Sequence, residues 1–330
     1  MSYYVNLIRM VMYTIICNIA LGIAMCVMVL QMPLYLFRKF FMKPSYKESN
    51  VRLFLHQPTN DSSVGSDRSP RDTILFIHGF PDCQSLWDDQ VKSLTKEGYR
   101  CLVAATPGSN GEAVPRALEA EEVVTLLKEA LADVCDEPVT VVGHDWGSVF
   151  ALLFRNTYPS QCKRMILLDV GLMGLPNLGV SLFCWIFMLS YQSLLAFCYF
   201  LGEPVGTFIL RAVVFMFMYK ERPLSELTCD MAFPYTSVAK LLLKKESGEA
   251  QVEARAVARR IPHLFLYGLE KEPLRFHDSN WEEFVRSTPH GKVISMPVGH
   301  WLMKEDADAT NFILTKWLEE TEGLTKVPDG

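Results

Sequence analysis

A short glycine-flanked segment carries a carboxylate where a nucleophile would stand. In GHDWG, residues 143–147, Asp145 lies at the centre of a G-x-D-x-G pattern directly after an apolar run, residues 139–142. Small residues two places before and after the central one permit a tight strand-to-helix turn, which lifts the central side chain above a sheet. A carboxylate oxygen placed there can attack an sp³ carbon and form an alkyl ester, which water then hydrolyses. We therefore interpret Asp145 as a nucleophile, with Gly143 and Gly147 permitting its turn.

A second loop is predicted to stabilise negative charge on that ester. The segment HGFP, residues 78–81, follows the apolar run 73–77. The backbone N–H of Phe80, together with that of Trp146, is expected to point at the oxygen that becomes negative as water attacks. One such preorganised donor contributes about 3–4 kcal/mol. We predict an oxyanion hole at Phe80 and Trp146, with motif support from His78, Gly79 and Pro81.

A late histidine is the candidate general base. In GHW, residues 299–301, His300 follows the last apolar run, 292–296. Of the seven histidines, it alone follows a strand late enough to keep the chain order nucleophile, acid, histidine. A neutral imidazole can take a proton from the attacking water.

The acid that should orient this histidine has three candidates. A carboxylate is needed to hold the imidazole tautomer and to stabilise the imidazolium. Asp169, directly after the apolar run 164–168, ranks first, followed by Glu270 and then Glu272.

The elements that must position these side chains alternate along the chain. Short apolar runs of this kind are typical of strands buried on both faces of a parallel sheet. Residues 120–134 are apolar at helical spacing, as expected for a crossover helix packed on such a sheet. We predict an α/β fold with a mostly parallel sheet flanked by helices. The predicted strands are residues 73–77, 100–104, 139–142, 164–168, 263–267 and 292–296.

A large apolar insertion interrupts the predicted sheet. Residues 170–202, which follow Asp169, contain no charged residue, and Arg211 is the only charged residue in 207–219. We interpret the insertion as a helical cap buried against the catalytic sheet, with shallow insertion into a bilayer surface, rather than as two membrane spans. The predicted domains are a membrane anchor (1–44), a first core part (45–171), the cap (172–260) and a second core part (261–330).

The amino-terminal segment is predicted to span a membrane. Residues 10–37 are uncharged and exceed the roughly 20 residues that a spanning helix needs. Lysines and arginines are denser after this stretch than before it, which predicts a cytoplasmic catalytic domain, on the endoplasmic reticulum or another endomembrane. The sequon at Asn60 offers a check, because a luminal domain could be glycosylated there.

Composition excludes several other classes of protein. The chain has 330 residues, of which 50% are hydrophobic and 21% charged, a composition that excludes intrinsic disorder. Its net charge of −5, without a cluster of lysines and arginines, gives no indication of nucleic-acid binding. Nine cysteines without a CxxC pair favour reduced thiols over a disulfide framework or a zinc site. We predict no metal or cofactor and no nucleic-acid partner, and we make no prediction of oligomeric state.

Taken together, these motifs resemble the α/β-hydrolase superfamily, and within it the epoxide hydrolase and haloalkane dehalogenase branch, whose nucleophile is Asp. The resemblance covers about residues 51–318 and rests on HGFP with a following Trp and Gln, GHDWG, the insertion and the late GHW. Phe80 favours epoxide hydrolases, because haloalkane dehalogenases more often carry Asn there. The resemblance implies an enzyme that converts epoxides to diols. The predicted anchor and the apolar cap add that the enzyme is membrane-anchored and that its epoxides are hydrophobic.

Three departures from the family pattern stand out. The segment after the second central strand, ATPGSNG at residues 105–111, differs from the family's usual one, and Lys271 occupies the family's usual acid position. The resemblance also implies two cap tyrosines that protonate the epoxide oxygen, for which no motif fixes the choice. Tyr235 ranks first and Tyr191 second, ahead of Tyr199 and Tyr219.

These departures keep other functions open. A dehalogenase or an esterase-like hydrolase would use the same fold. A catalytically silent, membrane-associated binding module is the alternative of another class. In each case the predicted partners are a hydrophobic small molecule and a lipid bilayer.

Overall fold

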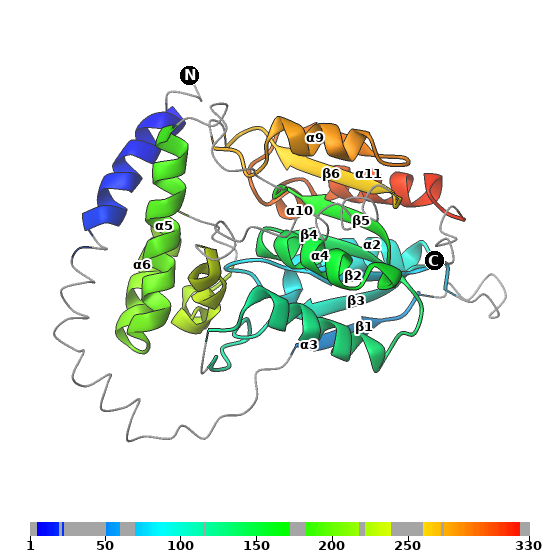
Figure 1. Cartoon of the computed structure of the whole chain (residues 1–330), viewed down its shortest axis with the longest axis horizontal. Helices are drawn as coiled ribbons and strands as arrows, with labels where there is room; N and C mark the ends of the chain where they lie inside the picture. Colours follow the sequence, from blue (N-terminus) through cyan, green and yellow to red (C-terminus); the bar gives the residue numbers. More distant parts are fainter. Residues whose placement is uncertain are drawn as a thin grey trace. The chain divides into compact units, whose positions relative to one another are not determined.

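The computed structural model describes residues 5–19, 22, 51–59, 70–114, 117–171, 182–217, 222–238, 260–271 and 274–323 (Figure 1). The chain divides into two compact units. Unit 1 comprises Met1–Asn50, Pro107–Glu119 and Pro176–Leu243, and unit 2 comprises Val51–Thr106, Ala120–Leu175 and Lys244–Gly330.

Unit 2 is built on one seven-stranded sheet with the order β1-β3-β2-β4-β5-β6-β7. Strand β1 pairs antiparallel with β3, and every other pair is parallel. The predicted mostly parallel sheet is therefore confirmed. The strands are β1 (Arg52–His56), β2 (Thr73–Ile77), β3 (Arg100–Ala105), β4 (Val139–His144), β5 (Cys162–Leu168), β6 (His263–Gly268) and β7 (Lys292–Met296).

Helices connect the parallel strands, because each parallel strand must start at the same end of the sheet and a crossover helix brings the chain back to that end. The predicted crossover helix is present as α3. The helical elements of unit 2 are η1 (Gln84–Trp87), α2 (Asp88–Lys96), α3 (Ala120–Ala132), α4 (Trp146–Thr157), η2 (Pro159–Gln161), α9 (Ser279–Arg286), α10 (Leu302–Glu305) and α11 (Ala307–Glu320).

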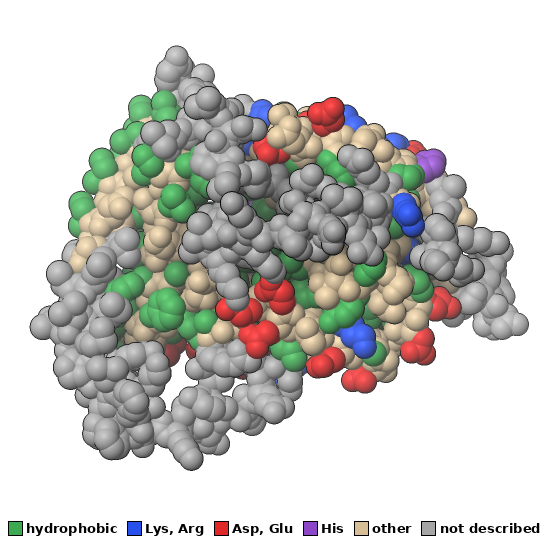
Figure 2. Space-filling view, viewed as in Figure 1, with side chains coloured by type: hydrophobic (Ala, Val, Ile, Leu, Met, Phe, Trp, Pro, Cys, Tyr) green, Lys and Arg blue, Asp and Glu red, His purple; other side chains and the backbone are tan. Residues whose placement is uncertain are grey.

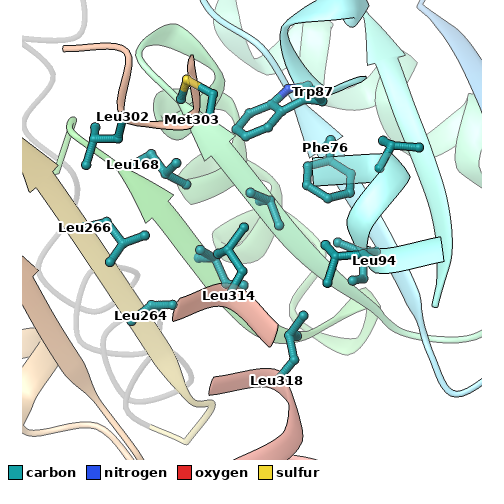
Figure 3. Close-up of a cluster of buried hydrophobic side chains, with 14 of the residues drawn as sticks. Phe76, Trp87, Leu94, Leu168, Leu264, Leu266, Leu302, Met303, Leu314 and Leu318 are labelled. Carbon is teal, nitrogen blue, oxygen red and sulfur yellow. The ribbon is translucent and has the colours of Figure 1, made fainter. Parts of the chain in front are cut away.

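The main hydrophobic core lies between one face of the sheet and the helices α2, α10 and α11. Figure 3 shows Phe76 and Leu266 from the strands facing Leu94, Leu314 and Leu318 from the helices. All five residues of β2 are buried, so alternate side chains also pack on the opposite face of the sheet. Burial on both faces fixes the position of the central strands β2, β4 and β5, and the predicted site residues Asp145 and Asp169 lie directly after β4 and β5.

Strand β1 was not predicted. It pairs only with β3 at the sheet edge, and four of its five residues are exposed. Its three consecutive apolar residues, Leu53, Phe54 and Leu55, follow a polar stretch and give neither clear alternation nor a long buried run.

Unit 1 contains a helix at Val5–Ile19, α5 (Leu182–Leu201), α6 (Val205–Phe217), η3 (Leu224–Glu226) and η4 (Cys229–Ser237). The first helix buries Met10 and Cys17, and Asn18 Nδ2 donates to Ser190 Oγ of α5 at 3.0 Å. Many apolar side chains of these helices remain exposed, and Figure 2 shows hydrophobic groups gathered over them at the left of the view. The most exposed are Ile8, Met12, Ile15, Ile19, Phe208 and Phe215.

Within the described part of the chain, one helix is long and apolar enough to cross a membrane. It is Cys184–Leu201 in α5, with a mean hydropathy of 1.6, and 44% of it is buried. The helix Val5–Ile19 is shorter than the roughly 20 residues that a span needs. Apart from Gly22, the rest of the expected span 10–37 lies outside the described residues, so the membrane anchor stays a prediction.

The predicted domain boundaries also stay predictions. Helices α5 and α6 lie inside the expected cap, 172–260. Unit 1 also takes in Pro107–Glu119, a segment that we had assigned to the first core part.

Candidate active site

Asp145 lies on the turn between β4 and α4 in an unusual backbone conformation. Its φ is 53° and its ψ −124°, a region that non-glycine residues rarely adopt and that is typical of functional turns. A Cβ on Gly143 would lie 2.5 Å from the carbonyl oxygen of Gly147, and one on Gly147 would lie 2.0 Å from that of Ile77. The two glycines therefore permit the close backbone approach that the turn requires.

One oxygen of the Asp145 carboxylate faces backbone donors. The N–H of Phe80 donates to Asp145 Oδ2 at 2.8 Å, and the N–H of Trp146 also donates to this carboxylate. A Cβ on Gly79 would lie 2.5 Å from Asp145 Oδ2, so glycine is needed for the loop to come this close. The structure thus brings together the two donors predicted for the oxyanion hole.

The other oxygen faces His300. Asp145 Oδ1 lies 3.8 Å from His300 Nε2, which is longer than a hydrogen bond. This oxygen is therefore free of a direct bond to the imidazole, while Nε2 is close enough to act on a water molecule bound beside the carboxylate.

His300 Nδ1 is hydrogen-bonded to Oδ2 of Asp169, the candidate ranked first. Asp169 directly follows β5 and has a φ of 67°. Its Oδ1 accepts the N–H of Gly268 at 3.0 Å and lies 2.7 Å from Nζ of Lys271. The carboxylate of Asp169 is fully buried and uses both oxygens.

Burial and neighbouring charges set the pKa values of the three groups. Burial raises the pKa of Asp145, and His300 and the two N–H donors only partly offset this. Burial alone would raise the pKa of Asp169, but Lys271 and His300 hold it well below its usual range. Burial alone would lower the pKa of His300, but Asp169 and Asp145 raise it overall. The imidazolium is thus stabilised by both carboxylates.

Two residues hold the loop that carries His300: Glu305, which we did not predict, and His144, which the sequence suggests as a loop-packing residue. The Glu305 carboxylate accepts the N–H of Gly299 at 2.6 Å and that of Trp301 at 3.1 Å. Burial lowers the pKa of His144 well below its usual value, and the neutral ring donates from Nε2 to the carbonyl oxygen of His300 at 3.0 Å. A glutamate in the first turn of a helix after GHW was the available signal for Glu305.

The remaining candidates lie elsewhere. Glu270 is exposed beyond β6, and Glu272 lies outside the described residues. His78 is fully buried and bonds the backbone at Gly79 (Nδ1, 2.8 Å) and Thr106 (Nε2, 3.2 Å), so it fixes the loop that also contains Pro81.

The candidate cap tyrosines all belong to unit 1. The rings of Tyr191 and Tyr235 are neighbours, with centroids 6.4 Å apart. Tyr199 donates its hydroxyl to the carbonyl oxygen of Val114 at 2.9 Å, which gives it a structural role. Tyr219 lies outside the described residues.

Nothing in the described ranges groups three or more His, Cys, Asp or Glu side chains as a metal site would. A carboxylate with one oxygen polarised by N–H groups and the other open can act as a nucleophile, and the buried Asp169–His300 pair can act as a general base.

Comparison with known proteins gives the same class of fold. Residues 72–195 match the model of the alpha/beta hydrolase fold family. Epoxide hydrolase 3 from Siraitia grosvenorii is 33% identical over 100 residues, which cover 29% of this chain and 32% of that protein. The chain thus matches only about a third of the length of this relative.

Longer matches exist at lower identity. The cis-3-alkyl-4-alkyloxetan-2-one decarboxylase of Shewanella oneidensis is 22% identical over 281 residues, which cover 76% of this chain and 83% of that enzyme. An epoxide hydrolase mutant from Vigna radiata superposes with a TM-score of 0.58 at 16% identity, over 83% of this chain and 97% of that chain. This last likeness shows the fold alone. The chain has the α/β-hydrolase fold, and about a third of it is similar in sequence to epoxide hydrolases.

Proposed function

We propose that this protein is an epoxide hydrolase that converts hydrophobic epoxides to diols through an Asp145 alkyl ester. One observation carries the proposal: a strained turn presents an aspartate whose Oδ2 accepts the Phe80 N–H at 2.8 Å, while its Oδ1 lies 3.8 Å from His300. Hydroxyl nucleophiles attack carbonyl carbons, whereas a carboxylate in this place suits an sp³ carbon.

The first step forms the ester. Oδ1 of Asp145 attacks an epoxide carbon, the ring C–O bond breaks, and the epoxide oxygen takes a proton from a tyrosine hydroxyl. Tyr235 and Tyr191 are the proposed donors, and their adjacent rings would let both hydroxyls serve one oxygen.

The second step hydrolyses the ester. His300 Nε2 takes a proton from water, whose oxygen attacks Cγ of Asp145, and Asp169 stabilises the imidazolium through Nδ1. Oδ2 carries the developing negative charge and stays held by the N–H of Phe80, and the N–H of Trp146 also donates to this carboxyl group. The Cγ–Oδ1 bond then breaks, and the diol leaves with Oδ1 and takes the proton held by the His300 imidazolium. The water oxygen remains in the Asp145 carboxyl group, whose proton is lost to solvent while the tyrosinate regains one.

Isotope labelling tests this sequence of bonds. In H₂¹⁸O, with enzyme in excess over a long-chain epoxide, the first-turnover diol should carry no ¹⁸O, and the peptide containing Asp145 should gain it. Direct attack of water on the epoxide would instead label the diol in the first turnover. A protein that forms no diol from any epoxide, alongside an equally inactive Asp145→Ala control, would overturn the proposal.

The proposed location is a membrane surface, with the catalytic domain on the cytoplasmic side. Exposed apolar side chains of unit 1, such as Ile15 and Phe208, support it, because water solvates them poorly. Full-length protein should stay with membranes after carbonate extraction, and Asn60 should remain unglycosylated in an endomembrane system. Release by carbonate, or glycosylation at Asn60, would contradict this location.

A strained four-membered lactone is the second candidate substrate. The observation that favours it is the match to the oxetanone decarboxylase, which extends over 76% of this chain, beyond the segment shared with the epoxide hydrolase. Loss of CO₂ from a dialkyl oxetan-2-one leaves an alkene. Adding such a lactone to the epoxide assay therefore separates the two by product, a diol against an alkene.

A further inference from the structure

Lys271 lies at the back of the candidate site, on the far side of Asp169 from His300. Its Nζ is 2.7 Å from Asp169 Oδ1 and 3.1 Å from the carbonyl oxygen of Gly268. The side chain is only 10% exposed, and its ammonium lies 5.7 Å from the centroid of the Phe276 ring. A buried cation aimed at a carboxylate that already serves another residue calls for an explanation.

We propose that Lys271 is a positioning residue: by binding Oδ1 of Asp169 it reserves Oδ2 for His300 and balances part of the carboxylate charge. The position that commonly supplies the acid in related hydrolases thus holds a cation that acts through an acid placed on the neighbouring strand. This role rests on the proposed function only for its effect on hydrolysis rate.

The physical consequence concerns the basicity of His300. Without a counter-charge, a buried Asp169 carboxylate would stabilise the imidazolium more strongly, and His300 would hold its proton to higher pH. A protonated histidine cannot accept a proton from water. Lys271 therefore keeps more of His300 in the neutral, basic form, consistent with its lowering effect on the pKa of His300.

The other charged groups around the pair are few among the described residues. Asp145 raises the pKa of His300 from the opposite side of the ring. His144 packs on His300 with ring centroids 4.5 Å apart and is kept neutral by burial. Burial also lowers the pKa of His277 to about 4, so it is neutral near pH 7, and its partner is Glu282 at 3.3 Å. Lys271 is thus the cation that acts on both Asp169 and His300.

The test is an NMR titration of His300 in the full-length protein, labelled with ¹⁵N-histidine and assigned with His300→Gln. Lys271→Met should move the His300 titration midpoint to higher pH. Lys271→Gln, which can still hydrogen-bond but carries no charge, should move it in the same direction. Lys271→Arg should leave it near the wild-type value.

Lys163→Met is the matched control. Lys163 is 15% exposed and pairs with the buried Asp72; it lies near the amino end of β5, the strand that Asp169 directly follows. The Lys163→Met variant should be less stable than wild type, but its His300 should titrate with the wild-type midpoint. An unchanged midpoint in folded Lys271→Gln, or an equal shift in Lys163→Met, would overturn the role of Lys271.

A kinetic arm separates this proposal from the proposed function. At a pH below the wild-type midpoint, Lys271→Gln should hydrolyse the alkyl ester on the order of tenfold more slowly, with ester formation little changed. Wild-type protein that turns over no substrate would overturn the proposed function, while the titration would still decide whether Lys271 tunes His300.

Discussion

The two ends of one sheet treat buried aspartates differently. At the amino ends of the strands, Asp72 forms ion pairs with Lys163 and Arg164 and also accepts the N–H of Thr73 and the hydroxyl of Thr140. Both oxygens are used and the backbone is unstrained. This cluster ties the start of β2 to the starts of β4 and β5.

At the carboxyl ends, the acids are fixed by hydrogen bonds, but Asp145 keeps an oxygen that is not bonded to His300. Asp145 and Asp169 both have positive φ. Oδ1 of Asp145 lies 3.8 Å from Nε2 of His300, too far for a hydrogen bond between them. A saturated ion cluster contributes to folding, whereas an acid left partly open in a strained turn can react. The difference predicts which end should lose activity and which should lose stability when an acid is removed.

The largest effect should come from Asp145. Asp145→Ala removes the attacking atom, so diol formation should fall by about 10⁴-fold or more. Its melting temperature should change little, because the cost of burying this charge offsets the loss of the bonds from the N–H groups of Phe80 and Trp146. Single-turnover rates and thermal unfolding of the same preparation check both points. Retention of even a tenth of the wild-type rate would remove Asp145 from the mechanism.

Asp169→Asn should damage both properties. Activity should fall by about 10²–10⁴-fold, because the imidazolium loses its partner. The folded-state pKa of Asp169 is lowered, so its stabilisation is present above the ordinary value and is lost as pH falls. The stability gap to wild type should therefore be full at pH 7 and shrink below about pH 4. A gap that widened on acidification, measured by urea unfolding, would contradict this assignment.

Asp72→Asn is expected to be a stability variant. It leaves Lys163 and Arg164 buried without a counter-ion, so unfolding should become easier by about 3–5 kcal/mol. The rate of the remaining folded protein should equal that of wild type. If the rate fell at constant folded fraction, the contrast between the two ends would fail.

The smallest effect should come from Glu305→Gln. Glu305 is exposed, but its carboxylate holds two N–H groups of the loop that carries His300. A neutral amide weakens both bonds, so ester hydrolysis should slow a few-fold, with the melting temperature nearly unchanged. Glu320→Gln, which breaks an exposed pair with Lys292, is the control and should have no kinetic effect.

Much of the scaffold could be read from local pattern. The six predicted strands correspond to β2–β7, because each is a short run rich in apolar residues, and β2 is buried along its whole length. Edge strand β1 could not be read, since exposed residues carry no burial signal. The order of the described strands across the sheet could not be predicted from local sequence pattern either, because it depends on pairing between segments far apart in the chain.

By itself, the sequence determined the turn around Asp145, since only glycines fit at residues 143 and 147. It also determined the loop of Phe80 and the late His300. It left three acids open and gave no role to Lys271. Only the tertiary structure places Asp169 against both His300 and Lys271. Parallel pairing aligns Leu168 with Leu266 and so brings Asp169, after β5, beside Gly268 and Lys271 at the end of β6. Residues a hundred positions apart meet only through that register, which no local spacing encodes.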